Sequence, residues 1–379
     1  MINKPLNKNF KKAFSLIELS VVVLIIGILI AGITQSSRLV RAMKLNTARS
    51  LTRSSDVNSI RNLTAWFDAT AEGVFSSSCN TASTNTNLTS TSRVFNTDTS
   101  NGNPSVTTPS SAYIMPEHRQ LVRLWKDSNP QGVDADKVIL EYAQNGNCTT
   151  QNYSVTGEKG PMYHNSGLAG LPSIYFDGAS NSWFSSINPV TMPIAAGKKD
   201  FSLFVVYRTD PDYSSSNYRS LLQFSPIGGN MSGANYITLI SSNPPSSDPC
   251  SAIPGLAFDP STSNCAAYSF RPQNARYTSK PSTEYVFGIA IDATDTTTSS
   301  TANTKIYLNS SSPATDLTLP STSSVLNSLI TGQLNVGGGY NGVFKGFISE
   351  VLIFDRKINN EEASSVMAYL VKKYNIKSL

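Results

Sequence analysis

Histidine is almost absent from this chain of 379 residues, which contains only His118 and His164. Neither has the spacing from other possible ligands that metal sites use, and we expect both on the surface, His118 in a polar stretch and His164 in a loop with Gly and Asn. The sequence also lacks a Gly-x-Ser-x-Gly nucleophile motif, and no Glu is followed two positions later by Asp. These absences argue against metal-dependent catalysis and against hydrolysis by an activated serine or by paired carboxylates on one strand. We therefore expect a protein that is not an enzyme.

Charged residues are also scarce. They make up 15% of the chain, whereas hydrophobic residues make up 39%, which is enough for at least one large core. Ser, Thr and Asn are abundant from Ser76 onward. This balance is typical of exported β-rich domains and not of helical cytosolic enzymes.

Cysteine occurs only at Cys79, Cys148, Cys250 and Cys265, and no two of these residues have the C-x-x-C spacing of zinc sites. In an oxidising compartment an even set of this kind indicates two disulfides. Cys250 and Cys265 enclose a loop of about 15 residues, for which a crosslink contributes roughly 3 kcal/mol. We favour Cys250 paired with Cys265 and, by elimination, Cys79 with Cys148. Four cysteines allow three pairings, and the sequence does not choose among them.

The longest apolar run extends from Phe14 to Thr34, about 20 residues, which suffice for one helix to cross a bilayer. Its only charge is Glu18. A cleavable secretory signal has a shorter apolar core, which is followed by a small-residue cleavage site. Here basic residues run directly into the apolar segment, and a carboxylate lies near its start. We therefore expect the segment to stay on the mature chain as a membrane-spanning helix.

The residues KKAFSLIELSVVVLIIGILIAG resemble the class III leader of type IV pilins and of type II secretion pseudopilins. The resemblance implies that prepilin peptidase removes a leader of residues 1–13 by cutting between Ala13 and Phe14, on the cytoplasmic side of the inner membrane. It also implies methylation of the new amine of Phe14 and assembly with other pilin subunits into an extracellular pilus or pseudopilus. Most members carry Gly where this chain has Ala13, which keeps the small size.

Glu18 is the charged side chain within the predicted membrane segment. A carboxylate in hydrocarbon costs about 2.5–3.5 kcal/mol on insertion scales and normally marks a functional pairing. The resemblance implies that Glu18 attracts the N-terminal amine of a neighbouring subunit and sets the axial stagger of a filament. The alternative is a side chain whose carboxylate reaches the membrane interface.

The formal charge of +5 does not indicate nucleic-acid binding. Four of the 30 basic residues lie in the leader, and their removal leaves 26 against 25 acidic residues. A nearly neutral chain without a dense stripe of Lys and Arg has no electrostatic footprint for nucleic acid. Arg38, Arg41 and Lys44 follow the apolar segment and nearly balance the leader lysines, so the orientation in the membrane rests on the motif.

The segment from Gln35 to about Asn62 contains neither Pro nor Gly, so we expect the N-terminal helix to span residues 14–62 and to pack one face of its second half on the exported part. From Leu63 onward, short apolar alternations separated by Gly, Pro, Ser and Asn predict a domain of two packed β-sheets over residues 63–379. The clearest predicted strands are Ser173–Phe176, Phe201–Arg208, Arg219–Phe224, Tyr236–Ile240, Tyr285–Asp292, Lys305–Leu308 and Phe347–Phe354.

Two further segments interrupt or end this pattern. Residues 76–111 are rich in Ser, Thr and Asn and have few large apolar residues, which predicts a surface insertion. Near the C-terminus, Asn359 and Glu362 have the spacing of a capping box. The apolar stripe that follows predicts a helix packed on the core through Ala363, Val366, Met367, Leu370, Val371 and Tyr374.

Six motifs then occur in a fixed order: LTAWFDAT, LWKDS, GLPSIYFDG, FSLFVVYRT, LNVGGGYNGVFKGFISEVLIFDRKINNEE and AYLVKKYNI. Together they resemble the laminin G-like branch of the concanavalin A-like lectin and glucanase superfamily, from about Leu63 to Ile376. The resemblance implies a jelly-roll β-sandwich with a binding role, because the paired carboxylates of the glucanases are missing.

Several residues are candidates for ligand binding. Asp177 and Asn181 could donate oxygens to a calcium ion, as in related domains, and the alternative is an Asp-Gly turn after a strand. Trp125, Trp183 and Tyr340 could stack on sugar rings, with a place in the core as the alternative for Trp125.

Three functions remain open. A minor pilin or tip adhesin, exposing a lectin-like domain to a glycan or a host-surface protein, is favoured because an exported part of this size would crowd the lattice of a major pilin. A type II secretion pseudopilin is the alternative, and a membrane-anchored glycan hydrolase is the third. The ligand does not follow from the sequence, because binding loops vary freely on one scaffold.

Overall fold

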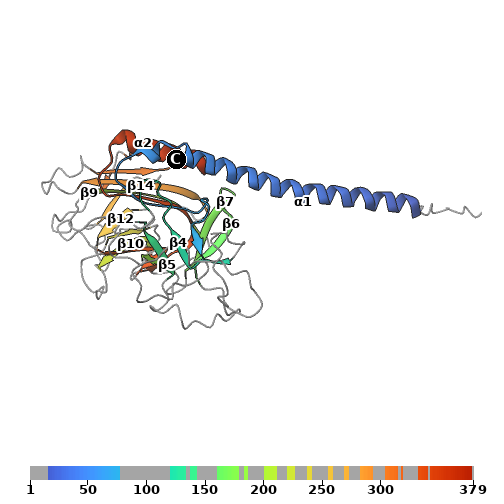
Figure 1. Ribbon diagram of the computed structural model, residues 1–379, viewed down its shortest axis with the longest axis horizontal. Helices are drawn as coiled ribbons and strands as arrows, with labels where there is room; N and C mark the ends of the chain where they lie inside the picture. The colour runs from blue at the N-terminus through green and yellow to red at the C-terminus, as the bar shows by residue number, and fades with distance from the viewer. Residues whose placement is uncertain are drawn as a thin grey trace, which may run out of the picture.

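The computed structural model describes residues 16–76, 120–133, 137–142, 160–178, 183–186, 200–210, 220–226, 237–240, 255–258, 269–272, 282–292, 304–314, 317–318, 332–339 and 342–377. Within them, one long N-terminal helix precedes a set of mostly antiparallel β-sheets, and a second helix ends the described chain (Figure 1). The mainly β class predicted from the sequence is confirmed.

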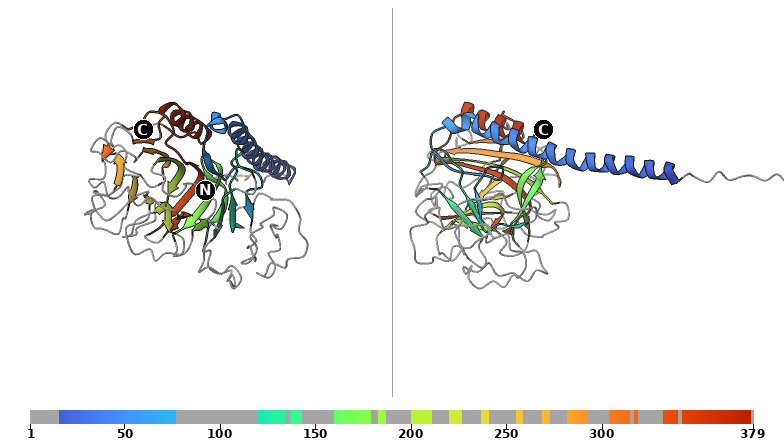
Figure 2. Two further views of the ribbon diagram at one scale, coloured as in Figure 1. Left: turned by 60° about the vertical axis from the view of Figure 1, so that its left-hand side comes forward. Right: turned by 45° about the vertical axis from the view of Figure 1, so that its right-hand side comes forward.

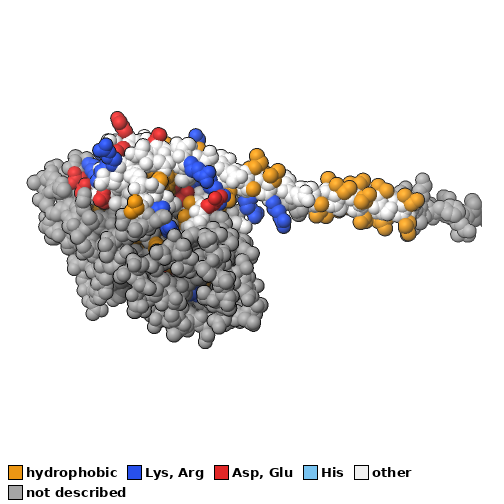
Figure 3. Space-filling model, viewed as in Figure 1, with side chains coloured by type: hydrophobic (Ala, Val, Ile, Leu, Met, Phe, Trp, Pro, Cys, Tyr) orange, Lys and Arg blue, Asp and Glu red, His pale blue; other side chains and the backbone are white. Residues whose placement is uncertain are grey.

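Helix α1 (Leu16–Arg53) projects from the rest of the molecule as a rod (Figure 1). Its most apolar stretch is long enough to cross a membrane, and none of that stretch is buried. Hydrophobic side chains cover the projecting end, and basic side chains follow where the helix approaches the domain (Figure 3). The long apolar helix expected from the sequence is therefore present.

Helix α1 ends at Arg53, before the predicted end at Asn62. The side-chain amide of Asn58 donates hydrogen bonds to the carbonyls of Thr52, Arg53 and Ser55 at 2.9, 3.1 and 3.0 Å, and so satisfies carbonyls at the end of the helix. The 3-10 helix η1 (Asp56–Ser59) follows and is capped by Ser55. The absence of Pro and Gly therefore did not reveal the end of the helix, because an Asn side chain closes it.

The first sheet has eight strands, in the order β15, β14, β9, β20, β7, β6 and β3, with β1 paired to β20 beside this path. Strand β20 is the centre of the sheet, since one of its edges pairs with β9 and the other is shared by β7 and β1. The strand bounds are β1 (Leu63–Asp68), β3 (Gln120–Leu121), β6 (Met162–Leu168), β7 (Leu171–Asp177), β9 (Asp200–Thr209), β14 (Glu284–Asp292), β15 (Lys305–Leu308) and β20 (Lys345–Phe354).

The second sheet has ten strands, in the order β16, β13, β12, β11, β10, β17, β8, β5, β4 and β2. Their bounds are β2 (Phe75–Ser76), β4 (Leu124–Lys126), β5 (Ile139–Tyr142), β8 (Phe184–Ser186), β10 (Ser220–Pro226), β11 (Ile237–Ile240), β12 (Gly255–Phe258), β13 (Ser269–Pro272), β16 (Leu317–Thr318) and β17 (Gly332–Val336). A two-stranded ribbon of β18 (Gly338–Gly339) and β19 (Gly342–Val343) completes the described strands.

A large apolar core lies between the two sheets and draws on both of them. Phe67 of β1 meets Trp125 of β4 edge-on with ring centroids 5.6 Å apart, and Phe176 of β7 meets Phe184 of β8 in the same way at 5.9 Å. Trp125 is fully buried, so the core position considered for it from the sequence is confirmed.

A second apolar cluster covers the opposite face of the eight-stranded sheet. Leu203 and Val205 of β9 point into the core between the sheets, whereas Phe204 and Val206 belong to this outer cluster, as the alternation of a strand requires. The end of α1 and helix α2 (Asn360–Lys373) lie side by side over this face (Figure 2). The predicted capping box of Asn359 and Glu362 is present at the start of α2.

The strands predicted from period-two alternation are all present, each with ends shifted by a few residues or not at all. The prediction for His164 was wrong, because this residue lies within strand β6, is half-buried and pairs in register with Ser173. The Gly and Asn beside it belong to a strand whose register with β7 shifts between His164 and Leu168. Of the predicted surface insertion only Ser76 lies among the described residues, where it ends β2.

Candidate functional site

The projecting half of α1 is the first candidate site, because it leaves a long apolar surface without cover. Its large apolar side chains are roughly half to four-fifths exposed. Contact of so much apolar surface with water is unfavourable. They are Leu16, Ile17, Leu19, Val21, Val22, Val23, Leu24, Ile25, Ile26, Ile28, Leu29 and Ile30. This surface requires a membrane or other apolar helices around it.

The other end of α1 is fixed to the domain. Ala48 is buried against the outer sheet face, and Leu51 packs beside it. The hydroxyl of Thr52 lies 2.8 Å from the hydroxyl of Tyr369 in α2 and accepts a hydrogen bond from Lys373 at 2.9 Å. Helix α1 is thus free at its apolar end and docked at its polar end.

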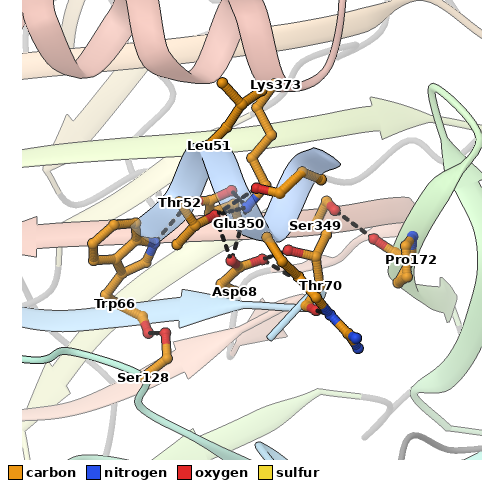
Figure 4. A network of polar contacts seen from close by, with 12 residues as sticks. Leu51, Thr52, Trp66, Asp68, Thr70, Ser128, Pro172, Ser349, Glu350 and Lys373 are labelled. Carbon is orange, nitrogen blue, oxygen red and sulfur yellow. Dashed lines mark hydrogen bonds and ion pairs between the residues drawn. The ribbon is translucent and has the colours of Figure 1, made fainter. Parts of the chain in front are cut away.

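A buried polar cluster, the junction network, lies beneath this docked end (Figure 4). We define it as Asp68 of β1, Glu350 of β20 and Lys373 of α2, together with the hydroxyl groups that bind them. The Lys373 ammonium lies 2.8 Å from Asp68 Oδ2 and 2.7 Å from Glu350 Oε2. All three side chains are buried almost completely, with exposures of 0 to 1%. Asp68 and Glu350 are direct cross-strand partners, so their like charges would destabilise the sheet without the cation between them.

Three neighbouring side chains donate hydrogen bonds to the carboxylate of Glu350. The Trp66 indole donates to Oε1 at 2.7 Å, the Tyr369 hydroxyl donates to Oε1 at 2.8 Å, and the Tyr374 hydroxyl donates to Oε2 at 2.9 Å. Burial raises the pKa of Glu350, and the charge of Lys373 opposes this effect. Burial also holds the pKa of Tyr369 and Tyr374 well above the usual value, so both hydroxyls stay protonated. Removing one partner from such a buried pair typically costs 3–5 kcal/mol.

A cavity of about 340 Å³ opens beside the junction network. Cationic and acidic side chains line it together: Arg49, Arg53, Lys126, Lys137, Asp68, Glu72 and Asp127. Asp127 Oδ1 accepts backbone hydrogen bonds from Trp66 and Asn129, both at 2.7 Å. Burial nevertheless raises the pKa of Asp127 to about 7, because desolvation outweighs these bonds. A carboxyl group whose pKa is raised this far, in a charged cavity, marks a candidate functional site.

The N-terminal segment was also compared with known protein families. A family model of the prokaryotic N-terminal methylation motif matches residues 8–34. The N-terminus is type IV pilin-like. The match covers the predicted cleavage position and the start of α1, and it fits a membrane-anchored precursor. No curated protein matches the sequence.

Several solved structures resemble the pilin-like chain at low identity. They include domain 4 of an extracellular arabinanase from Geobacillus stearothermophilus (10% identity, TM-score 0.36, 55% of this chain and 81% of that one). They also include an arabinofuranosidase in complex with arabinofuranosyl-alpha-1,2-xylobiose (14% identity, TM-score 0.45, 67% of this chain and 51% of that one). A third is a Trypanosoma rangeli sialidase in complex with DANA (10% identity, TM-score 0.32, 65% of this chain and 30% of that one). The pilin-like chain thus spans about half of the arabinofuranosidase and about a third of the sialidase. The concanavalin A-like assignment stays a prediction.

The structure locates only some of the residues proposed from the sequence. Glu18 lies in the first turn of α1. Ala13, Phe14, Asn181, His118, Tyr340 and the cysteines Cys79, Cys148, Cys250 and Cys265 lie outside the described residues, so the cleavage site and the disulfides stay predictions.

Asp177 ends strand β7 and accepts a long hydrogen bond of 3.4 Å from the Gly160 amide. Gly178 follows with a φ of 76°, which suits the Asp-Gly turn considered as the alternative to calcium binding. Among the residues the structure describes, no three His, Cys, Asp or Glu side chains gather in a way that could hold a metal ion. Calcium binding therefore stays a prediction.

Sequence reasoning missed the junction network. Asp68, Glu350 and Lys373 were each present in motifs of the β-sandwich resemblance, but nothing in the sequence joined them. One signal was available, because Lys373 falls between Leu370 and Tyr374 on the apolar stripe of α2. A lysine on the buried face of a helix requires a buried acidic partner.

Proposed function

We propose that this chain is a low-copy or tip subunit of a type IV pilus or a related filament, and that its β-sandwich binds a glycan or a protein on another cell surface. The observation that carries the proposal is the division of α1 into an uncovered apolar half and a docked polar half. Neighbouring helices in a filament would cover the apolar half of α1. The docked half would hold the domain at a fixed place relative to those helices.

The methylation motif supports the assembly part of this proposal. Prepilin peptidase would cut between Ala13 and Phe14, and the precursor would wait in the inner membrane with its domain outside the cytoplasm. The carboxylate of Glu18 would then pair with the Phe14 amine of a neighbouring subunit. The same motif occurs in secretion pseudopilins. Location in a surface pilus would therefore distinguish a pilus subunit from a pseudopilin.

The binding part rests on the predicted lectin-like architecture and on the charged cavity beside the junction network. Catalysis is not part of the proposal. The buried carboxylates of Asp68 and Glu350 are both bound to Lys373, and neither is available as a nucleophile or an acid for glycoside hydrolysis. In this proposal the cavity holds a ligand without cleaving it.

Purified surface filaments provide the test. Filaments sheared from intact cells should contain the chain, and its N-terminal peptide should begin at Phe14 with one added methyl group. A chain that stays in the membrane fraction of a piliated strain, or that still begins at Met1, would contradict the proposal. Recovery only in cells that overproduce a secretion system would favour the pseudopilin alternative.

A further inference from the structure

Lys373, Asp68 and Glu350 meet in a way that goes beyond an ordinary ion pair. The single ammonium group contacts both carboxylates at 2.7 to 2.8 Å. The carboxylates come from the first and the last strand that pack under α2, the helix that carries Lys373. The amine of Lys373 is therefore held against the carboxyl group of Asp68, with a second carboxyl group beside both of them.

The surroundings exclude water from this contact. The Lys373 Nζ atom lies 5.5 Å from the ring centre of Tyr369 and 5.4 Å from that of Tyr374. The indole of Trp66 meets Tyr369 edge-on at 5.9 Å and closes another side. Trp66 and Tyr374 are fully buried. Charged groups lose their hydration here, and a neutral product formed from them would relieve that cost.

We propose that Lys373 and Asp68 form an intramolecular isopeptide bond, with Glu350 as the proton carrier. The bond joins Lys373 Nζ to the side-chain carbonyl carbon of Asp68. This crosslink is independent of the proposed pilus function.

The reaction needs no co-reactant. Glu350 takes a proton from the Lys373 ammonium, and the lone pair of the resulting amine attacks the carboxyl carbon of Asp68. The C–O bond to one Asp68 oxygen then breaks, and this oxygen leaves as water. Both protons lost by Nζ end on the departing water, and Glu350 returns to its starting state. Burial raises the pKa of Glu350, which favours the protonated form that the second half of the reaction requires.

Intramolecular placement supplies the driving force that free amines and carboxylates lack in water. Well-oriented reacting groups in one molecule reach effective concentrations of about 10⁵–10⁸ M. The Thr70 amide and hydroxyl donate to Asp68 Oδ1 at 2.8 and 2.7 Å and hold the carboxyl group in place. Oδ2 is thereby left facing Lys373.

The position of the bond has a mechanical consequence. Asp68 ends the strand that follows α1, and Lys373 lies in the last turn of α2. An isopeptide bond between them would close nearly the whole exported part into one covalent ring at the point where α1 enters it. If α1 is held in a filament, as proposed above, tension on the domain would pass through this ring and not only through hydrogen bonds.

Peptide mapping of the full chain, purified in detergent, tests the bond directly. After reduction and trypsin digestion, we expect the peptides containing Asp68 and Lys373 as one branched species, whose mass is their sum minus one water. Trypsin should not cut after Lys373. The Lys373→Met and Glu350→Gln variants should lack the branched species, whereas Lys372→Met, which changes the exposed neighbouring lysine, should keep it.

Two separate linear peptides from the folded wild-type chain would overturn the proposal. This result does not depend on whether any variant folds, because the unmodified chain alone decides it. If the branched species persists in Glu350→Gln, the bond itself is supported but the role of Glu350 as proton carrier is overturned. The pilus proposal is unaffected by either outcome, since its test measures location in sheared filaments.

Discussion

The hydroxyl groups of Thr52 and Tyr369 lie 2.8 Å apart, although 317 positions separate them in the sequence. This contact joins the last turn of α1 to α2, and Lys373 donates to the same Thr52 oxygen. The orientation of the projecting helix is therefore coupled to the buried charges of the junction network.

The Thr52→Val variant should weaken this joint. Valine keeps the shape of threonine but leaves the buried ammonium of Lys373 with one acceptor fewer and the Tyr369 hydroxyl with one hydrogen-bond partner fewer, which typically costs about 1–3 kcal/mol. Chemical denaturation of the detergent-purified chain should show the loss. Thr47→Val is the matched control, because Thr47 is exposed and bonds only to the carbonyl of Met43 in its own helix. Equal loss in both variants would mean that helix propensity, and not the joint, is responsible.

A soluble fragment should begin near Asn46 and not at Leu63. A start at Asn46 removes the exposed apolar half of α1 but keeps Ala48, Thr52 and Val57, which are buried or bonded to the domain. A start at Leu63 exposes the surface under them, so we expect that fragment to be less stable by several kcal/mol. Thermal unfolding of the two fragments, side by side, measures the difference. Equal midpoints would show that the end of α1 does not contribute to the domain.

Stability should depend on pH through Asp127. Its pKa is about 7 in the folded chain against an ordinary value of 3.8, so the folded state holds the proton more tightly than the unfolded state. This contribution is complete below about pH 4 and is lost as the pH rises through 7. The Asp127→Asn variant keeps an acceptor for Trp66 and Asn129 and lacks the titration. Its stability relative to wild type should therefore rise between pH 4 and 8, by roughly 4 kcal/mol at most.

Urea unfolding at a series of pH values checks this prediction. Asp56→Asn is the control, because Asp56 is exposed in η1. If the difference in the free energy of unfolding between Asp127→Asn and wild type does not change with pH, Asp127 is not a buried carboxyl group that titrates in this range.

Glu18→Ala should separate membrane insertion from filament assembly. Removing a charge from the apolar half of α1 eases partitioning into the bilayer, so the membrane fraction should keep the protein. The sheared filament fraction should lose most of it, because the proposed pairing with the amine of Phe14 is gone. Ser20→Ala, a small change in the same turns of α1, is the control. Equal recovery of both variants in filaments would remove the subunit-pairing role of Glu18.

Ligand binding should be detectable without hydrolysis. The fragment that begins near Asn46 should bind a subset of a glycan array, and repetition with a calcium chelator tests the predicted role of Asp177 and Asn181. Lys126→Ala and Lys137→Ala should reduce binding if the charged cavity holds the ligand. Release of reducing sugar from a polysaccharide panel would instead favour the hydrolase alternative.

The sequence predicts this fold well where the evidence is local. In β9 and β14, successive side chains face the core between the sheets and the outer cluster in turn, and this alternation is visible in the sequence. The capping box of α2 requires only Asn359 and Glu362. The end of α1 was not predictable in this way, because it depends on the side chain of Asn58 folding back onto the helix.

The junction network lies beyond local reasoning for a different reason. Asp68 and Glu350 are neighbours only because β1 pairs with β20, and Lys373 reaches them only because α2 packs over that pair. Lys373 on the apolar stripe of α2 signals a buried acidic partner, but the sequence does not say which residues supply it. The raised pKa of Asp127 likewise comes from burial by distant elements, which no motif records.

The two helices lie on one face of the eight-stranded sheet, so the ten-stranded sheet is turned away from α1 (Figure 1). Where this subunit stands in a filament built around apolar helices, that sheet would face away from the filament axis. Antibodies raised against intact cells should then recognise the far side of the sandwich and leave the helical side unmarked. Variation among strains should accumulate on the same side, while the helical side stays constant.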